Sequence, residues 1–304
     1  MLGLPQTPGD VAQVNTLWEG QFARFDLVKR TELHQKSVIR VLDVEIGGPD
    51  FVVMAGPCSV ENERQTIETA EAVRAAGATI LRGGAFKPRS SPYSFQGLGL
   101  EGLKILAKAR RITGLAIVTE AMSETEIGMV AEYADIVQIG SRNMENTSLL
   151  LAAARCGRPI LLKRGLTARI EDLLQAAQLV MESGNPDVIL CERGIRTFET
   201  ATRNTLDIQA VPVLHAVTHL PVIVDPSHAS GVRELVPLLA RVAVAADAEG
   251  LIVEVHPDPA RALCDGEQSL TFAMFREMMA DLAPYRALRA QKQEAAMALA
   301  AEQS

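Results

Sequence analysis

The segment F-V-V-M-A at residues 51–55, followed directly by G-P-C-S at 56–59, is the first of eight short apolar runs that decide the fold. The other seven are equally rich in aliphatic residues and lie at 79–81, 116–118, 136–139, 160–162, 188–190, 222–224 and 251–253. The runs begin about 29 residues apart on average, the length of one strand and one helix with their loops. Because they are apolar on both faces, we expect them to form a buried parallel sheet.

Helical patterns lie between these runs. Residues 63–76 repeat apolar side chains at helical spacing and are followed by Gly77, where a helix can stop. Residues 167–181 carry an apolar stripe of the same kind. Ser123 and Glu126 resemble a capping box at the start of a third helix.

Eight strand–helix units of this length predict an α/β fold, the (β/α)8 TIM barrel, which needs roughly 250 residues. A doubly wound open sheet is the alternative. It is less favoured because none of the apolar runs ends directly in a G-x-G-x-x-G turn.

The two ends of the chain differ from its middle. Residues 37–45 alternate between apolar and polar, so we expect a short hairpin that closes the bottom of the barrel. Residues 1–36 look partly helical, and residues 286–304 are rich in Ala, Gln and Glu, which is typical of a helix. We therefore predict an N-terminal arm (1–36), a catalytic barrel with its hairpin (37–285) and a C-terminal helical tail (286–304).

The composition excludes several classes of protein. Of the 304 residues, 48% are hydrophobic and 22% are charged, which is ordinary for a globular protein. The net charge of −7 argues against a general surface for nucleic acid or anionic membranes. The sequence has neither an apolar run of membrane-spanning length nor a secretory signal pattern. Its four cysteines are scattered and form no C-x-x-C pair, so we expect a reduced, cytoplasmic protein.

Polar residues follow almost every apolar run, and in a barrel these strand ends gather on one rim. Six cations are expected there: Arg82, Lys87, Arg89, Arg142, Lys163 and Arg193. Such a concentration in an acidic protein indicates a multiply anionic ligand that carries phosphate and carboxylate groups. The alternative is that the cations pair with rim carboxylates such as Glu120 and Glu192. That alternative is reasonable for one cation and weak for all six.

A second set of polar residues indicates a metal site. Its members lie at or beyond the first, seventh and eighth strand ends, which barrel closure brings together: Cys58, His228, Glu254 and Asp265. A thiolate, an imidazole and two carboxylates suit a divalent transition metal, without selecting one. Each residue also has a simpler interpretation. Cys58 could be a small buried apolar residue, His228 a hydrogen-bonding rim residue, and Asp265 the cap of a turn.

Two other chemistries are alternatives for the same rim. Asp225, Ser227 and His228 are too close in sequence for a hydrolase triad, and the chain has no G-x-S-x-G turn. A Schiff-base aldolase would use Lys163 with a lowered pKa. A phosphate-binding role accounts better for the wider set of cations.

Seven motifs that occur in order at the strand ends resemble the 3-deoxy-D-arabino-heptulosonate 7-phosphate (DAHP) synthase family, in its type I-beta subfamily. They are A-G-P-C-S-V-E (55–61), L-R-G-G-A-F-K-P-R-S-S-P-Y-S-F-Q-G (81–97), Q-I-G-S-R-N (138–143), L-L-K-R-G (161–165), I-L-C-E-R-G-I-R-T-F-E (189–199), V-D-P-S-H-A-S-G (224–231) and V-E-V-H-P-D-P (253–259). The likeness covers residues 40–285.

The resemblance implies a transferase that condenses phosphoenolpyruvate with erythrose 4-phosphate, the first committed step of the shikimate pathway to the aromatic amino acids. It also implies a divalent metal, which in this family is manganese, iron, cobalt, zinc or cadmium. The family's Cys, His, Glu and Asp ligands correspond to Cys58, His228, Glu254 and Asp265.

The resemblance also implies substrate contacts. It assigns the phosphate of phosphoenolpyruvate to Arg142 and Arg193, with backbone help near Glu120 and Ser141, and its carboxylate to Arg82, Lys87 and Lys163. The phosphate of the aldose falls to Arg89 and Ser90, within the K-P-R-S segment that contains Pro88. The resemblance leaves open which group transfers the protons: Lys87, His228, Asp265 or metal-bound water.

The related 3-deoxy-D-manno-octulosonate 8-phosphate synthase, which uses arabinose 5-phosphate, is the alternative within this resemblance. That family typically has K-A-N-R where this chain has K-P-R-S at 87–90. The earlier position of the arginine favours the four-carbon aldose. A catalytically silent barrel that serves as a scaffold is a further alternative, disfavoured because the metal set and the cations are all present.

The resemblance also bears on regulation, because relatives often carry a fused ferredoxin-like or chorismate mutase domain. Neither the segment before the first strand nor the tail after Pro284 is long enough to build a core of its own. The arm does carry apolar surface, in Trp18, Phe22 and Phe25. We expect a homo-oligomer, dimer or tetramer, that is insensitive to phenylalanine, tyrosine and tryptophan when alone. Feedback control would then come in trans, for example from a docked chorismate mutase.

Overall fold

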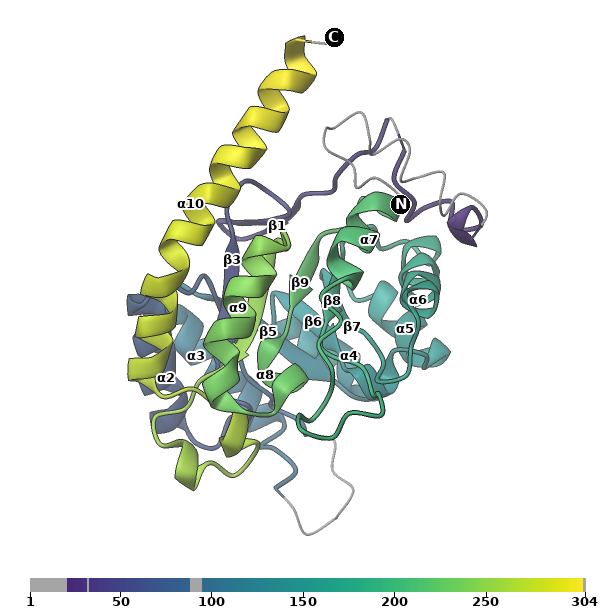
Figure 1. Cartoon of the computed structure of the whole chain (residues 1–304). Coiled ribbons are helices and arrows are strands. Elements are labelled where there is room, and N and C mark those ends of the chain that lie inside the picture. Colours follow the sequence, from purple (N-terminus) through teal and green to yellow (C-terminus); the bar gives the residue numbers. More distant parts are fainter. Residues whose placement is uncertain (1–20, 32, 88–94, 303–304) are drawn as a thin grey trace.

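The eight apolar runs form the strands of a closed parallel barrel, in the order β10-β3-β4-β5-β6-β7-β8-β9. These strands are β3 Val52–Gly56, β4 Ile80–Arg82, β5 Ala116–Ala121, β6 Ile136–Ile139, β7 Ile160–Lys163, β8 Val188–Glu192, β9 Val222–Val224 and β10 Gly250–Glu254. The barrel closes where all five residues of β10 pair in parallel with the five of β3. The predicted (β/α)8 barrel is confirmed (Figure 1).

The computed structural model describes residues 21–31, 33–87 and 95–302. Four residues singled out from the sequence, Trp18, Pro88, Arg89 and Ser90, lie outside this described part. No helix within the described residues is long and apolar enough to cross a membrane.

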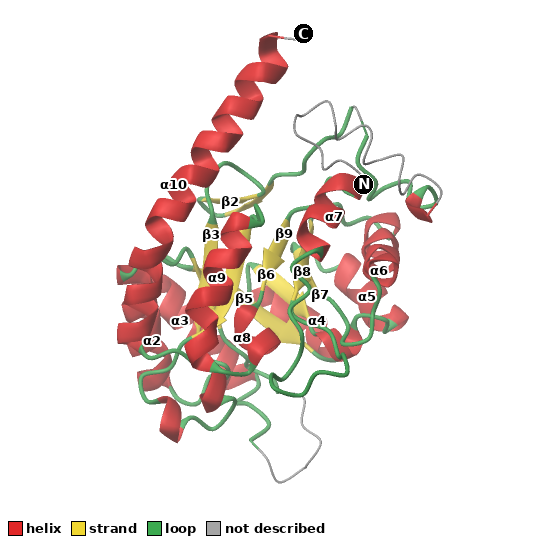
Figure 2. Cartoon of the chain, viewed as in Figure 1, coloured by secondary structure: helices red, strands yellow, loops and turns green. Residues whose placement is uncertain are grey.

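Helices surround the strands (Figure 2). They are α2 Glu63–Ala75, α3 Leu100–Thr113, α4 Glu124–Tyr133, α5 Thr147–Ala154, α6 Ile170–Glu182, α7 Ala210–Val217, α8 Pro226–Ser230, α9 Val236–Ala245 and α10 Phe272–Glu302. Alternate strand residues face opposite sides, so Val53 and Leu81 pack in the outer layer that includes helix residues such as Val73. Met54 and Ile80 pack instead inside the barrel.

A short antiparallel hairpin precedes the barrel, as predicted. Its strands are β1 Ile39–Val41 and β2 Val44–Ile46. Three of its side chains, Ile39, Val41 and Ile46, belong to the same buried cluster as the interior strand residues. The hairpin therefore covers the end of the barrel from which the strands begin.

Residues near both ends of the described part of the chain pack on the barrel's outer shell, including Phe25 and Phe275. Phe25 is 1% exposed, and the backbone N–H groups of Leu27 and Val28 donate to Gln178 of α6. The C-terminal residues continue α10, which begins inside the barrel domain and extends past it (Figure 1). Arg289 fixes this helix through an ion pair with Asp247 at 2.9 Å.

Local details differ from the sequence predictions. Ser123 caps α4 without a side-chain hydrogen bond, because its hydroxyl bonds to Thr125 while Glu126 accepts from Met122 N–H; the predicted capping box is therefore wrong. The predicted helix over 167–181 begins at Ile170. A G-x-G-x-x-G sequence does occur at residues 97–102, but it lies well beyond β4 and α3 begins within it.

Candidate active site

Polar side chains form the last inward-facing layer of the barrel. Along β5, for example, Ala116 and Val118 face the interior and Glu120, the next position of the same face, lines the cavity above. The same step of two residues leads to Gly56 in β3 and to a polar residue at the end of each of the six remaining strands: Arg82, Gln138, Lys163, Arg193, Asp225 and Glu254. The alternation of side chains along the strands therefore places these residues at the bottom of the site.

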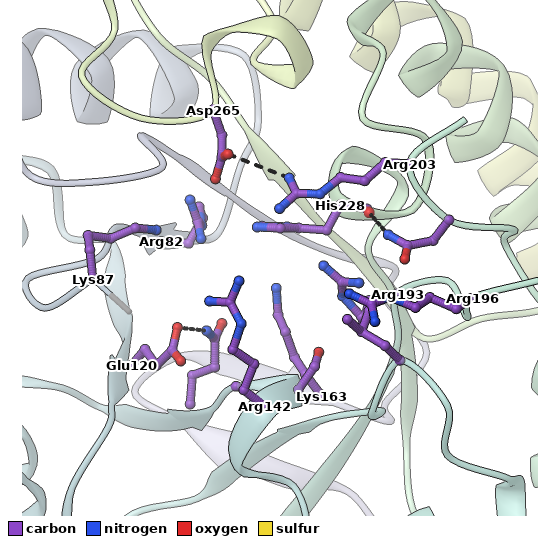
Figure 3. Close-up of a pocket in the computed structure, with 15 residues that line it drawn as sticks. Arg82, Lys87, Glu120, Arg142, Lys163, Arg193, Arg196, Arg203, His228 and Asp265 are labelled. Carbon is purple, nitrogen blue, oxygen red and sulfur yellow. Dashed lines mark hydrogen bonds and ion pairs between the residues drawn. The ribbon is translucent and has the colours of Figure 1, made fainter. Parts of the chain in front are cut away.

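A cavity of about 220 Å³ opens at this end of the barrel (Figure 3). Seven cationic side chains line it: Arg82, Lys87, Arg142, Lys163, Arg193, Arg196 and Arg203. The acidic residues that line it within the described part of the chain are Glu120 and Asp265. Ser141 and His228 also contribute to the wall. An excess of positive charge in a confined cavity favours a small, multiply charged anion.

Several of these cations have carboxylate partners. Arg82 contacts Glu254 at 3.0 Å, and Lys163 forms an ion pair with the buried Asp225. The two carboxylates considered as partners from the sequence bind other groups. Glu120 accepts from Gln138 at 3.2 Å, and Glu192 accepts from Arg164 at 2.8 Å.

Arg193 differs from these paired cations. Its side chain is buried at the wall of the cavity, and its Nε and Nη1 atoms have no hydrogen-bond partner. Burial lowers the pKa of its guanidinium, although Asp225 opposes the effect. A buried donor without an acceptor is costly, so the geometry favours an anionic ligand at this position.

The four predicted metal ligands come together beside the cavity. His228, Glu254 and Asp265 place one donor atom each within 4.8 Å of one another, and Asp265 belongs to a second such group with Cys58 and Cys264. Cys58 Sγ lies 3.2 Å from Asp265 Oδ2, and His228 Nε2 lies 3.3 Å from Glu254 Oε1. Sulfur, imidazole nitrogen and carboxylate oxygen are suitable donors for a divalent transition metal.

Neighbouring residues orient these donors. Asp225 accepts from His228 Nδ1 at 2.7 Å, which leaves Nε2 directed toward Glu254. Gln268 donates to the second oxygen of Glu254 at 2.8 Å. Lys87 Nζ lies 3.1 Å from Cys58 Sγ, so a positive charge faces the thiol.

The protonation states suit metal binding. Burial lowers the pKa of His228, which favours the neutral imidazole that ligates. Burial opposes ionisation of Glu254, but the facing His228 and Arg82 lower its pKa overall. Burial and the hydrogen bond with Cys264 raise the pKa of Cys58, so its thiol keeps a proton that a bound cation would displace. The residues present therefore fit a divalent ion.

The structure adds residues that the sequence analysis did not assign to the site: Arg196, Arg203, Asp225, Cys264 and Gln268. Arg196 and Arg203 follow the sixth apolar run, so the rule that located the other cations could have included them. Cys264 precedes Asp265 directly. Nothing in the sequence indicates that Gln268 contacts Glu254.

This fold and this site define a class: a TIM-barrel enzyme with an anion-binding cavity beside a candidate metal centre. The chain belongs to the DAHP synthetase I family, whose family model matches residues 28–286. It is 52% identical over 258 residues to the phospho-2-dehydro-3-deoxyheptonate aldolase of Thermotoga maritima, which covers 85% of this chain and 76% of the relative.

Two further comparisons bear on the alternatives. The crystal structure of the T. maritima phospho-2-dehydro-3-deoxyheptonate aldolase (DAHP synthase) matches with a TM-score of 0.85 at 50% identity, covering 87% of this chain and 77% of that one. A 2-dehydro-3-deoxyphosphooctonate aldolase of Desulfatibacillum aliphaticivorans is 34% identical over 263 residues, covering 81% of this chain and 95% of the relative.

Proposed function

We propose that this chain condenses phosphoenolpyruvate with erythrose 4-phosphate to give DAHP and inorganic phosphate. The observation that carries the proposal is Arg193, a buried guanidinium with unpartnered N–H groups in a cavity lined by six further cations. Family membership and the greater identity to the heptonate enzyme, 52% against 34% for the octonate enzyme, support the same choice.

We propose separate positions in the cavity for the phosphate and the carboxylate of phosphoenolpyruvate. Arg142 and Arg193 are proposed to hold its phosphate, with backbone help near Ser141 and Glu120, which line the same cavity. Arg82, Lys87 and Lys163 would face its carboxylate. Lys163 and Arg82 are already held by buried carboxylates, so their positions are set before the substrate arrives.

The aldose phosphate would be bound from the K-P-R-S segment, by Arg89 and Ser90. The aldehyde of this substrate is proposed to lie near the metal ligands Cys58, His228, Glu254 and Asp265. A divalent ion held there supplies Lewis acidity to the aldehyde.

Carbon 3 of phosphoenolpyruvate then bonds to the aldehyde carbon, and the aldehyde oxygen takes up a proton. Water adds at carbon 2, and phosphate leaves with cleavage of the C–O bond. Lys87, His228 and Asp265 line the cavity and are the proposed protein groups for proton transfer.

The assay that tests this function measures phosphate release from phosphoenolpyruvate with erythrose 4-phosphate and, in parallel, arabinose 5-phosphate. We expect release with the four-carbon sugar, loss of activity after chelation and recovery with manganese, iron, cobalt, zinc or cadmium ions. Preferential use of arabinose 5-phosphate would support 3-deoxy-D-manno-octulosonate 8-phosphate synthase instead.

Three further properties belong to this proposal. They are a cytoplasmic location, assembly as a homodimer or homotetramer, and regulation in trans by a chorismate mutase. Light scattering of the purified chain, alone and mixed with a chorismate mutase, tests the last two.

A further inference from the structure

A second thiol lies inside the candidate metal centre. Cys264 is 4% exposed, and its Sγ lies 2.9 Å from Cys58 Sγ and 3.4 Å from Asp265 Oδ2. Both cysteines are free thiols, and their sulfurs are farther apart than the roughly 2.05 Å of a disulfide. From this arrangement we infer that Cys264 is an additional metal ligand, so that the centre offers two sulfurs and favours thiophilic ions such as Zn²⁺ or Cd²⁺ over Mn²⁺.

The distances allow one ion to bond to both thiols. The atoms Cys58 Sγ, Cys264 Sγ and Asp265 Oδ2 form a triangle with sides of 2.9, 3.2 and 3.4 Å. Every side is shorter than about 4 Å, twice a typical bond length between zinc and its ligands, so a single ion can reach all three atoms. Asp265 also belongs to the group with His228 and Glu254, which joins the sulfur ligands to the nitrogen and oxygen ligands.

A lysine ammonium group faces the thiol of Cys58. Lys87 Nζ lies 3.1 Å from Cys58 Sγ and also donates to the Cys58 carbonyl oxygen at 3.2 Å. A buried cation beside a thiol stabilises the deprotonated form that binds metals.

The two loops that carry the thiols are fixed to each other. Glu61, three residues after Cys58, accepts a hydrogen bond from Leu263 N–H at 2.8 Å. Asp265 adopts a left-handed backbone conformation, with φ of 47°, which turns the chain between Cys264 and the short helix that follows. Adjacent side chains of an extended segment would point apart, whereas this turn lets Cys264 and Asp265 face the same cluster.

The consequence is a difference in metal preference, since thiolates suit Zn²⁺ and carboxylates suit Mn²⁺. Removal of Cys264 should therefore weaken Zn²⁺ binding by roughly ten-fold or more and leave Mn²⁺ binding nearly unchanged. This inference rests on the proposed function, because it concerns the same metal centre.

The test uses the full chain, stripped of metal, kept reduced and titrated with Co²⁺. Thiolate-to-cobalt charge-transfer absorption in the near ultraviolet reports the number of sulfur ligands. We expect the band of the unsubstituted chain to fall by about half in Cys264→Ser and in Cys58→Ser, as one of two thiolates is lost. Cys156→Ser, at a half-buried cysteine outside this cluster, is the matched control and should keep the full band. Competition with Zn²⁺ and Mn²⁺ then measures the change in preference.

A full-strength band in Cys264→Ser would overturn the inference while leaving the proposed metal centre intact. Absence of Co²⁺ binding by the unsubstituted chain would instead contradict the metal centre itself. If circular dichroism shows that Cys264→Ser does not fold, ¹¹³Cd NMR of the unsubstituted chain replaces the cobalt titration as the test of the number of sulfur ligands. A chemical shift typical of two sulfur ligands supports the inference, and one typical of a single sulfur overturns it.

Discussion

The carboxylate of Asp225 lies 2.7 Å from Nδ1 of His228 and forms an ion pair with Lys163 through the same oxygen, Oδ2. Asp225 is 1% exposed and also accepts from the backbone N–H of His228 at 2.9 Å. One buried carboxylate thus connects a candidate metal ligand to a cation of the substrate cavity. It orients the imidazole and positions the lysine together.

Asp225→Asn should therefore weaken two functions at once. The amide lacks the negative charge that pairs with Lys163, and its NH2 group cannot accept, so it cannot satisfy both the ring N–H and the backbone N–H of His228 as the carboxylate does. We expect metal affinity to fall by about 10- to 100-fold and the KM for phosphoenolpyruvate to rise. Metal titration and steady-state kinetics measure the two effects, with the exposed Asp43→Asn as a control. A change in stability alone would contradict the positioning role.

Metal removal should abolish turnover. The ligand atoms of His228, Glu254 and Asp265 lie within 4.8 Å of one another, and the divalent ion that they would hold supplies Lewis acidity to the aldehyde in the proposed reaction. Cys58→Ala should also lose activity and still fold, because the barrel core does not depend on one thiol. Full activity in exhaustively chelated protein would contradict this prediction.

Arg193→Ala should raise the KM for phosphoenolpyruvate by roughly 10- to 100-fold, the effect of losing a charged hydrogen bond. The two unpartnered N–H groups of Arg193 are the donors that a bound phosphate would use. Arg193→Lys should restore part of the affinity. Arg74→Ala, at an exposed position of α2, removes the same charge away from the cavity and should change little. Equal KM values for both alanine variants would place the phosphate elsewhere.

Glu249 should make stability depend on acid pH. It directly precedes β10 in the chain. Its carboxylate accepts from Val222 N–H at 2.8 Å and pairs with His215 and Lys36, each at 3.0 Å. Burial opposes its ionisation, but His215 and Lys36 lower its pKa from 4.5 to about 2. The stabilisation is complete above the unfolded-state pKa and is lost as the pH falls toward 2.

Glu249→Gln tests this dependence. The variant should be less stable than the unsubstituted chain at pH 7, by roughly 3 kcal/mol. The difference should stay constant down to about pH 5 and shrink below it. Thermal denaturation of both proteins across this range measures the effect, and a gap that does not narrow with acid would refute the assignment.

The amino-acid sequence by itself determined the barrel and most of its rim. Each strand is a short apolar run such as residues 160–162. The period of two along the strand directs the side chain of the polar residue that follows to the inside of the barrel. The position of Lys163 at the site can therefore be predicted from its own strand, without information about the neighbouring strands. The same local logic predicted the hairpin at 37–45, and it failed at Ser123, where competing polar groups changed the cap.

Only the tertiary structure decided which of these residues act on one another. Cys58 and Cys264 are 206 positions apart, and their contact depends on closure of the barrel and on the left-handed turn at Asp265. The pairing of Lys163 with Asp225 and the unpartnered groups of Arg193 depend likewise on how the ends of different strands are placed side by side. Distances between residues that are far apart in the sequence are set by the whole fold, so they cannot be predicted from a local sequence pattern.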